Sequence, residues 1–434
     1  METLKIANYV PRIVDEEISE LMGIFGAVVI EGPKWCGKTT TAKNHALSET
    51  SMADPSNDFQ ARRVAELDPT LALEGPRPRL IDEWQDVPKL WDAVRYECDR
   101  ATARGQFILT GSSSPKKRKT ADKEQPKHSG AGRMVRIPMG TMTQQEMRLS
   151  TGAVSIRGLF KGESGKGISG LSLKDVASRV VKGGWPDAID LTPEQASRIA
   201  KGYLQAVIEE DIHEVDGIER DKDKVRKLIG SLARNESTLA SNKTLIKDAK
   251  DPGAAEDTLT APTLNEYLDA LRRLYFVQDI PPWAPSIRSS TRIRSAAKRH
   301  LADSSLAAAA LGASVETLVR DPETLGFLFE SLVAHDLMAY AGAMGARVRH
   351  YHDDSDLEAD LVLEAADGFW IPVEVKLGAS QVDAAAKSLL AVKEKMERGG
   401  YRSPSALLVV VGVGGVAAKR DDGVQVATLD TLGV

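Results

Sequence analysis

The 434-residue chain has little cysteine and no long hydrophobic run. Its two cysteines, Cys36 and Cys98, are too few for a disulfide scaffold or a cysteine-based zinc site. No apolar stretch reaches the roughly 18 residues that a membrane-spanning helix needs, and the N-terminal segment does not read as a signal peptide. These absences favour a cytoplasmic protein that does not enter a membrane.

Positive charge is not in excess, because the formal net charge is -5. Basic residues gather locally instead, at 113–136 and 286–300. Each stretch can be a solvated loop or helix face, or a patch that binds phosphate or nucleic acid. The first stretch is also rich in Lys, Ser, Pro and Gly, which predicts a mobile insertion.

The segment "VVIEGPKWCGKTTTA", at 28–42, carries a phosphate-loop motif. It matches G-x-x-x-x-G-K-[ST] at Gly32, Gly37, Lys38 and Thr39. The glycines allow backbone amides to face phosphate oxygens. The Lys38 ammonium would contact the β- and γ-phosphates, and the Thr39 hydroxyl would bind Mg²⁺. The motif therefore predicts a bound nucleoside triphosphate.

The surroundings of the motif support this interpretation. Residues 27–31 predict a buried strand, and the residues after the loop can begin a helix whose N-terminal dipole favours an anion. Trp35 either stacks near a base or packs against a neighbouring loop. The predicted nucleotide contacts in the loop are Gly32, Pro33, Lys34, Trp35, Cys36, Gly37, Lys38, Thr39 and Thr40.

An acidic strand end follows at 77–88, "RPRLIDEWQDVP". We expect Asp82 to bind Mg²⁺ and Glu83 to act as the general base toward water. The two carboxylates could instead cap the next helix. A separation of roughly fifty residues from the phosphate loop suits one intervening strand-and-helix unit, and this favours the metal and base roles.

The next predicted strand, "GQFILTGSSS", ends in hydroxyl residues. Thr110 and Ser112 are candidates for sensing the γ-phosphate, and a plain transition from strand to turn explains them equally well. Further on, Arg133 is predicted as a finger or sensor arginine supplied across a subunit boundary, with Arg136 competing for the role.

The order of these motifs resembles that of a family of bacterial and archaeal AAA-type P-loop ATPases. Members of that family end in a domain of unknown function that looks like a restriction endonuclease. The resemblance continues through "GGWPDAI", "YLQAVIEEDI", "KRHLADSSLAAAALG" and "PVEVKLG", and so covers nearly the whole chain. It implies an AAA-type fold, ATP and Mg²⁺ as ligands, and a homo-oligomer as a candidate assembly. The stretch after Ser113 and residues 251–262 are longer than the family pattern.

The middle of the chain, 197–274, shows apolar residues at helical spacing. Three helices and a short strand pair make it a winged-helix candidate. Its third helix, at 262–274, would expose Asn265, Asp269, Arg272 and Arg273. Because acidic character on this face makes it a poor reader of the major groove, a structural role or docking of a protein partner is slightly favoured over sequence-specific DNA binding.

From residue 323 the pattern predicts the order α-β-β-β-α-β, the core order of restriction-endonuclease-like nucleases. Asp360 and the pair Glu374 and Lys376 match the metal-binding strand residues of such enzymes, and Glu330 on the preceding helix could add a ligand. Two carboxylates beside a lysine can hold Mg²⁺ and position water against a phosphodiester. A surface salt bridge or an inactive binding module remains the alternative.

His350 and His352 are two residues apart on a predicted strand. Polar residues near a hairpin explain them better than a zinc site does.

The sequence therefore predicts an α/β multidomain protein. Residues 1–195 form an AAA-type P-loop ATPase, 196–300 a helical, winged-helix-like domain, and 301–434 a restriction-endonuclease-like domain. Its predicted activity is ATP hydrolysis, with the nucleotide state gating a nuclease-like domain that acts on or binds DNA or RNA. The alternative is a nucleotide-dependent switch that binds a protein partner and carries an inactive nuclease-like module.

Overall fold

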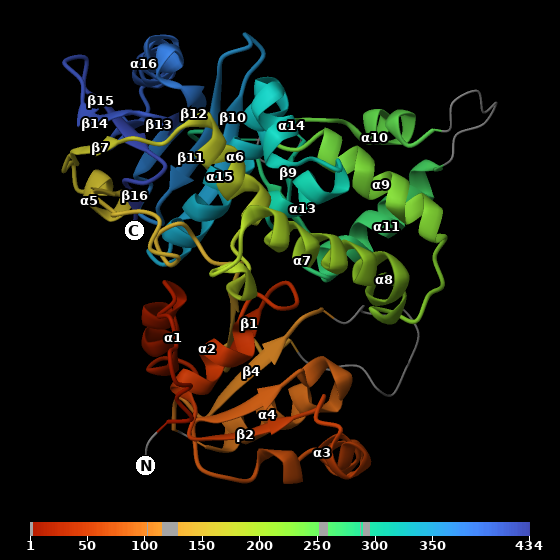
Figure 1. Ribbon diagram of the computed structural model, residues 1–434. Coiled ribbons are helices and arrows are strands. Elements are labelled where there is room, and N and C mark those ends of the chain that lie inside the picture. Colours follow the sequence, from red (N-terminus) through yellow and green to blue (C-terminus); the bar gives the residue numbers. More distant parts are fainter. Residues whose placement is uncertain (1–2, 102, 115–128, 251–258, 287, 290–295) are drawn as a thin grey trace. The chain divides into compact units, whose positions relative to one another are not determined.

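The computed structural model describes the chain except for residues 1–2, 102, 115–128, 251–258, 287 and 290–295 (Figure 1). Two compact units are present. Unit 1 comprises Met1–Thr141, Asp211–Glu219 and Ala270–Phe276, and unit 2 comprises Met142–Glu210, Arg220–Asp269 and Val277–Val434. Much of both basic stretches and of the 251–262 insertion lies outside the described residues, so the predicted mobile insertion and nucleic-acid patches stay predictions.

Unit 1 is built on a parallel five-stranded sheet. Its strands, in spatial order, are β2 (Ser48–Ser51), β3 (Arg79–Asp82), β4 (Phe107–Gly111), β1 (Ala27–Glu31) and β5 (Met134–Pro138). Because β4 pairs with both β1 and β3, it lies between the phosphate-loop strand and the acidic strand. The carboxyl ends of all five strands meet at one edge, where ligands bind in such sheets.

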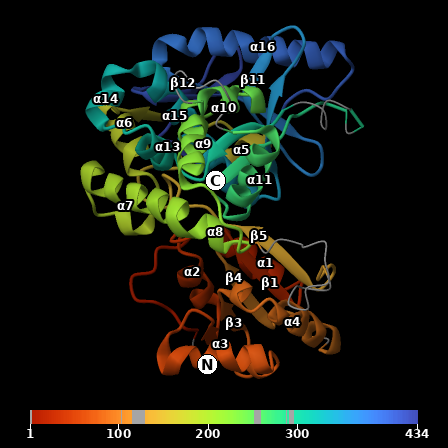
Figure 2. The same cartoon turned by 90° about the vertical axis from the view of Figure 1, so that its right-hand side faces the viewer.

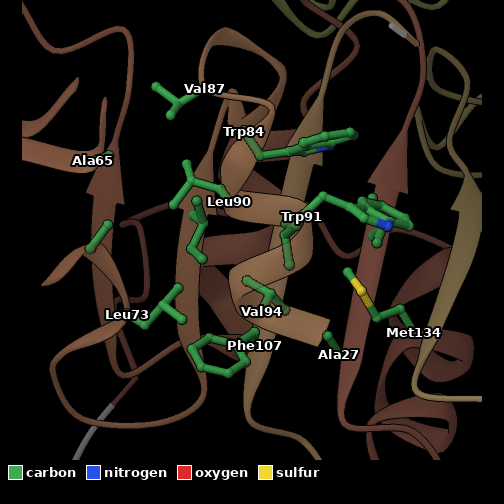
Figure 3. Close-up of a cluster of buried hydrophobic side chains, with 14 of the residues drawn as sticks. Ala27, Ala65, Leu73, Trp84, Val87, Leu90, Trp91, Val94, Phe107 and Met134 are labelled. Atoms are coloured by element: carbon green, nitrogen blue, oxygen red, sulfur yellow. The ribbon is translucent and has the colours of Figure 1, made fainter. Parts of the chain in front are cut away.

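Helices cover both faces of this sheet, which explains why its strands are continuous apolar runs. Ala27 and Val29 of β1 pack in a cluster with residues of α3 (Ser56–Leu67) and α4 (Lys89–Arg100). The alternate residues Val28 and Ile30 pack with α1 (Val14–Met22) and α2 (Lys38–His45). Figure 3 shows Leu90, Trp91 and Val94 of α4 directed at the strands. Each large side chain buried in this way stabilises the unit by roughly 1.5–3 kcal/mol.

Unit 2 contains a mixed seven-stranded sheet. Its spatial order is β10 (Arg347–His352), β11 (Glu358–Glu364), β12 (Trp370–Gly378), β13 (Leu407–Val413), β15 (Val424–Thr428), β14 (Gly415–Lys419) and β7 (Gly167–Ser169). Helix α16 (Val382–Arg398) covers one face through Leu389, Val392 and their neighbours (Figure 2). Helix α15 (Pro322–Gly342) packs on the other, where the Phe329 ring lies against Gly412. The chain thus follows the predicted order of α15, β10, β11, β12, α16 and β13.

The predicted domain boundary at residue 195 does not match these units. Strand β6 (Val154–Ser155) pairs with β16 (Leu432–Gly433), and β7 pairs with β14, so residues from 142 onward join the C-terminal part. Pairing between strands this far apart in the chain leaves no local signal in the sequence, so the sequence does not predict this grouping.

The middle of the chain is helical, as its periodicity predicts. It runs through α7 (Pro193–Ala206), a π-helical turn (Val207–Asp211), α8 (Ile212–Glu214), α9 (Lys222–Arg234), α10 (Asn242–Asp248) and α11 (Ala261–Arg273). An antiparallel strand pair follows, β8 (Val277–Ile280) with β9 (Lys298–Leu301). The winged-helix assignment stays a prediction. Unit 2 also contains α5 (Ile156–Phe160), α6 (Leu173–Lys182), α13 (Ser304–Ala310) and α14 (Val315–Arg320).

The "GGWPDAI" and "ADSS" segments hold unit 2 together. The buried Asp303 carboxylate accepts hydrogen bonds from the Gly184 amide at 2.9 Å and from the Ser305 amide and hydroxyl. The same hydroxyl accepts from the indole N–H of Trp185, which is buried against Tyr203. These motifs therefore form a buried polar junction within the fold.

Within the described parts of the chain, every helix is too short or too polar to cross a membrane.

Candidate functional site

The phosphate loop connects β1 to α2 at the carboxyl edge of the sheet. Gly37 adopts a left-handed conformation (φ 101°) directly before the first helical residue, Lys38, which glycine permits without strain. A Cβ on Gly32 would lie 1.9 Å from the Met139 carbonyl oxygen, so this position also requires glycine. The helix start turns its free backbone N–H groups toward the loop, the arrangement that favours phosphate.

The Lys38 side chain is almost fully buried and folds over its own loop. Its ammonium donates a 2.8 Å hydrogen bond to the Pro33 carbonyl oxygen. Thr39 and Thr40 lie in the first turn of α2. Cys36 is buried with its thiol toward Met139, whereas Trp35 has a left-handed backbone (φ 63°) and is 56% exposed.

Arg12 ties the loop to the end of β5, a role that the sequence did not reveal. Its guanidinium donates to the carbonyl oxygens of Cys36, Gly140 and Thr141 at 2.8–3.0 Å. Three backbone carbonyls in two segments therefore share one buried cation, which fixes the loop against the sheet edge.

The Asp82 carboxylate accepts hydrogen bonds from hydroxyl groups of three elements. Its Oδ1 accepts from Thr39 of α2 at 2.7 Å and from Thr110 of β4 at 2.6 Å, and its Oδ2 accepts from Ser51 of β2 at 2.9 Å. The structure thus brings together the predicted magnesium ligands Thr39 and Asp82 with the predicted sensor Thr110. Carboxylate and hydroxyl oxygens are the hard donors that Mg²⁺ prefers, so this donor set fits the ion.

Glu83 lies directly beyond the strand end in a left-handed conformation (φ 52°). Its carboxylate accepts from the Ser112 hydroxyl at 2.9 Å and from the Gln85 amide. A left-handed non-glycine residue is held there only by its surroundings and is common at functional sites. The second hydroxyl candidate, Ser112, therefore orients Glu83 while Thr110 contacts Asp82.

Lys34 of the loop pairs with Asp211 of the π-helical turn. The two charged atoms are 2.5 Å apart, and the Asp211 side chain is 6% exposed. Burial lowers the pKa of Lys34, but the hydrogen bond and charge of Asp211 outweigh it, so the net shift is upward. The sequence did not predict this pair, because its members are 177 residues apart.

A second connection joins the segment 270–276 to the sheet edge. Arg273 donates to the Ser114 carbonyl at 2.9 Å and pairs with Asp216 at 3.0 Å. The Tyr275 and Ser114 hydroxyls are 2.6 Å apart. The expectation that Arg273 lies on an exposed helix face is wrong, because its side chain is 11% exposed in this ion pair.

Glu31, at the end of β1, is a further buried acid of this edge. Burial raises its pKa against the opposing effects of Arg136, which pairs with it, and of the Tyr275 hydroxyl. The Arg136 guanidinium also lies 4.4 Å from the centre of the Trp91 ring.

Arg133 is not brought to the phosphate loop of its own chain. It precedes β5, and the parallel register of β1 and β5 puts it at the amino edge of the sheet, opposite the loop. Its side chain pairs with Asp99 at 2.7 Å. A role as a finger across a subunit boundary stays a prediction.

The predicted C-terminal site residues lie close together in unit 2. Lys376 of β12 pairs with Glu374 at 2.6 Å and with Asp360 of β11 at 3.1 Å. Glu330 of α15 pairs instead with Lys298 of β9 at 2.6 Å. Burial raises the pKa of Glu374 to about 7, with Asp360 adding to the shift and Lys376 opposing it.

Among the described residues, no group of three or more His, Cys, Asp or Glu side chains is arranged to hold a metal ion. The proposed metal roles of Glu330, Asp360 and Glu374 therefore stay predictions. His350 is buried, and its Nε2 lies 3.0 Å from the Ala296 carbonyl oxygen. Burial lowers the His350 pKa to about 4.

Three family descriptions match parts of the chain. Residues 25–148 match an AAA domain. Residues 173–317 and 325–432 match two domains of unknown function, DUF8612 and DUF4143.

An uncharacterized protein of Mycobacterium tuberculosis is 25% identical over 345 residues, which cover 78% of this chain and 67% of that protein. Among solved structures, the Walker-type ATPase PABY2304 of Pyrococcus abyssi has a TM-score of 0.44 and 11% identity over 71% of this chain and 98% of that chain. The ORC2 protein of Aeropyrum pernix has a TM-score of 0.32 and 14% identity over 76% of this chain and 98% of that chain. Together with the loop, the sheet order and the Asp82 contacts, the AAA-domain match supports an AAA-type P-loop ATPase domain in the N-terminal part of this chain.

Proposed function

We propose that unit 1 binds ATP with Mg²⁺ and hydrolyses it. The observation that carries this proposal is the convergence on Asp82 of hydroxyl groups from α2, β4 and β2, directly beside the phosphate loop. Such a cluster of oxygen ligands next to a buried lysine and a helix N-terminus suits a triphosphate and its metal ion.

Different residues of the phosphate loop and the sheet edge bind the phosphates, hold the cation and accept the proton. Backbone amides of the loop and the Lys38 ammonium bind the phosphates, and the Thr39 hydroxyl and Asp82 carboxylate hold the cation. Bound Mg²⁺ would offset the negative charge that develops on the phosphate oxygens. Glu83, oriented by Ser112, takes the proton from the attacking water.

The nucleotide state is coupled to the rest of the chain through Lys34. Its partner Asp211 ends the π-helical turn through which the chain enters unit 1 from α7. A triphosphate competes with Asp211 for the Lys34 ammonium, because both are anions beside one cation. Release of Asp211 would loosen the segment 211–219, which continues into α9.

This coupling favours a nucleotide-dependent switch over a gated nuclease. The partner that the switch engages is a protein or a nucleic acid, and the response of ATP turnover to DNA or RNA distinguishes the two. Stimulation by nucleic acid supports the nucleic-acid class, and an unchanged rate supports the protein class.

ATP turnover by wild type, Lys38→Ala and Glu83→Gln tests the proposed activity. Wild type should release phosphate in a Mg²⁺-dependent reaction. Lys38→Ala should lose both binding and turnover, whereas Glu83→Gln should keep ATP binding and lose turnover by about 100-fold or more. Equal rates in wild type and Glu83→Gln would remove Glu83 as the base, and an inactive wild type that still binds ATP would leave a nucleotide sensor.

A further inference from the structure

A buried cluster of opposite charges lies in unit 2 where α15, β9, β11 and β12 meet. Its acids are Glu330, Asp360 and Glu374, each no more than 8% exposed. Its bases are Lys298 and Lys376. We call these five residues the carboxylate–lysine cluster.

A β-bulge aims Asp360 into the cluster. Where β10 has one residue, His350, between two paired positions, β11 has two, Asp360 and Leu361. Bulges of this kind turn a side chain out of the regular alternation. Asp360 Oδ2 then accepts from the Val375 amide at 2.8 Å as well as from Lys376.

Lys298 reaches the same place from β9. It is 8% exposed, and its ammonium donates to Glu330 Oε1 at 2.6 Å and to the Asp360 carbonyl oxygen at 3.2 Å. The sequence placed Lys298 in a basic stretch with a solvated or nucleic-acid-binding face, and the structure corrects this for Lys298. One cation thus bridges a carboxylate of α15 and the backbone of β11.

Two lysines face the three acids, and burial raises the pKa of Glu330 to about 8 and that of Glu374 to about 7. Glu374 Oε1 is buried and makes no hydrogen bond within the part of the chain that the structure describes. Carboxylates in such an interior need a cation nearby, because an isolated buried charge costs several kcal/mol. In this cluster the ammonium groups of Lys298 and Lys376 supply the positive charge that the carboxylates need.

We propose that Lys298 is the resident cation of the carboxylate–lysine cluster and takes the position that a divalent metal ion would need. A metal ion bridging α15 and β11 would have to displace an ammonium that already contacts both elements. The three carboxylates of the cluster therefore form ion pairs with lysines and do not bind a divalent metal ion. This inference concerns unit 2 and does not depend on ATP hydrolysis in unit 1.

Binding of Mn²⁺ to the full-length chain, followed by calorimetry, tests the proposal. All proteins carry Asp82→Asn, so that the nucleotide site does not contribute. The Asp82→Asn protein should bind no Mn²⁺ below millimolar concentration. Adding Lys298→Met should create a site at least tenfold tighter, and adding Asp360→Asn to that protein should abolish it.

Arg299→Met is the matched control, because Arg299 is the next residue of β9 and donates to Ala240 and Asn242 outside the cluster. It should gain no Mn²⁺ site. The proposal is overturned if the Asp82→Asn protein already binds Mn²⁺ at a site that Asp360→Asn removes, or if folded Lys298→Met gains none. If Lys298→Met shows no cooperative thermal transition, the test is Mn²⁺ binding by the Asp82→Asn protein with and without Asp360→Asn. Equal binding by these two proteins supports the proposal, and a site lost with Asp360→Asn overturns it.

Discussion

Replacing Asp211 by Asn tests the link between the phosphate loop and the π-helical turn. The substitution keeps the size of the side chain and removes the charge that Lys34 contacts at 2.5 Å. Two unit charges about 4 Å apart attract by roughly 4 kcal/mol at an effective dielectric constant of 20. Desolvation of the buried carboxylate offsets much of this, and the 39% exposure of the Lys34 side chain screens the pair further.

The remaining contribution is about 1–2 kcal/mol, so Asp211→Asn should lower the free energy of unfolding of unit 1 by that amount. At about 2–4 °C per kcal/mol, calorimetry can resolve the fall in melting temperature. The freed Lys34 keeps its charge beside the loop. ATP affinity should therefore hold or rise, by up to about tenfold for 1.4 kcal/mol.

Glu49→Gln is the control for this experiment. It breaks the Lys43–Glu49 pair of the same unit, whose side chains are 29% and 41% exposed, and should change stability by less than about 0.5 kcal/mol. The reasoning is refuted if Asp211→Asn is no more destabilising than Glu49→Gln, or if it weakens ATP binding as strongly as Lys38→Ala does.

Three further outcomes follow from the contacts. Asp82→Asn should lower Mg²⁺-dependent ATP turnover by at least about 100-fold, measured as phosphate release, while ATP affinity without Mg²⁺ changes little; an unchanged Mg²⁺ dependence would argue against the metal role. Asp303→Ala leaves buried donors of Gly184 and Ser305 without an acceptor and should cost about 3 kcal/mol or more in denaturant unfolding; a loss under 1 kcal/mol would contradict the junction. Burial holds the His350 pKa at about 4 against an ordinary 6.5, so below pH 6.5 the unfolded chain binds the proton first. Wild type should thus lose up to about 3 kcal/mol relative to His350→Gln as the pH falls from 6.5 to 4, and parallel stability curves would refute this.

The proximity of the phosphate loop to Asp82 and Thr110 was largely predictable from the sequence, because the signals for these residues are local. The glycine-rich loop after β1, the acidic residue at the end of β3 and the hydroxyl residues at the end of β4 each belong to the end of a buried strand. Strands of a parallel sheet end at a common edge, so these residues meet without any further information. Thr110 and Asp82 are an example, at 2.6 Å.

The remaining site residues depend on contacts between distant segments. Nothing in the spacing connects Lys34 with Asp211 or Lys298 with Glu330, because each pair is made by packing of separate elements. One signal did exist: a carboxylate such as Glu330 inside a long apolar helix requires a buried partner. The sequence indicated that Glu330 requires a cationic partner but did not identify Lys298 as that partner.

Calorimetric titration of the full chain with ATP and Mg²⁺ tests the central claim most directly. Wild type should bind ATP at the phosphate loop, and Lys38→Ala should weaken that binding by at least about tenfold with its melting temperature little changed. No binding to wild type, or equal affinity in the two proteins, would contradict a nucleotide held between Lys38 and Asp82.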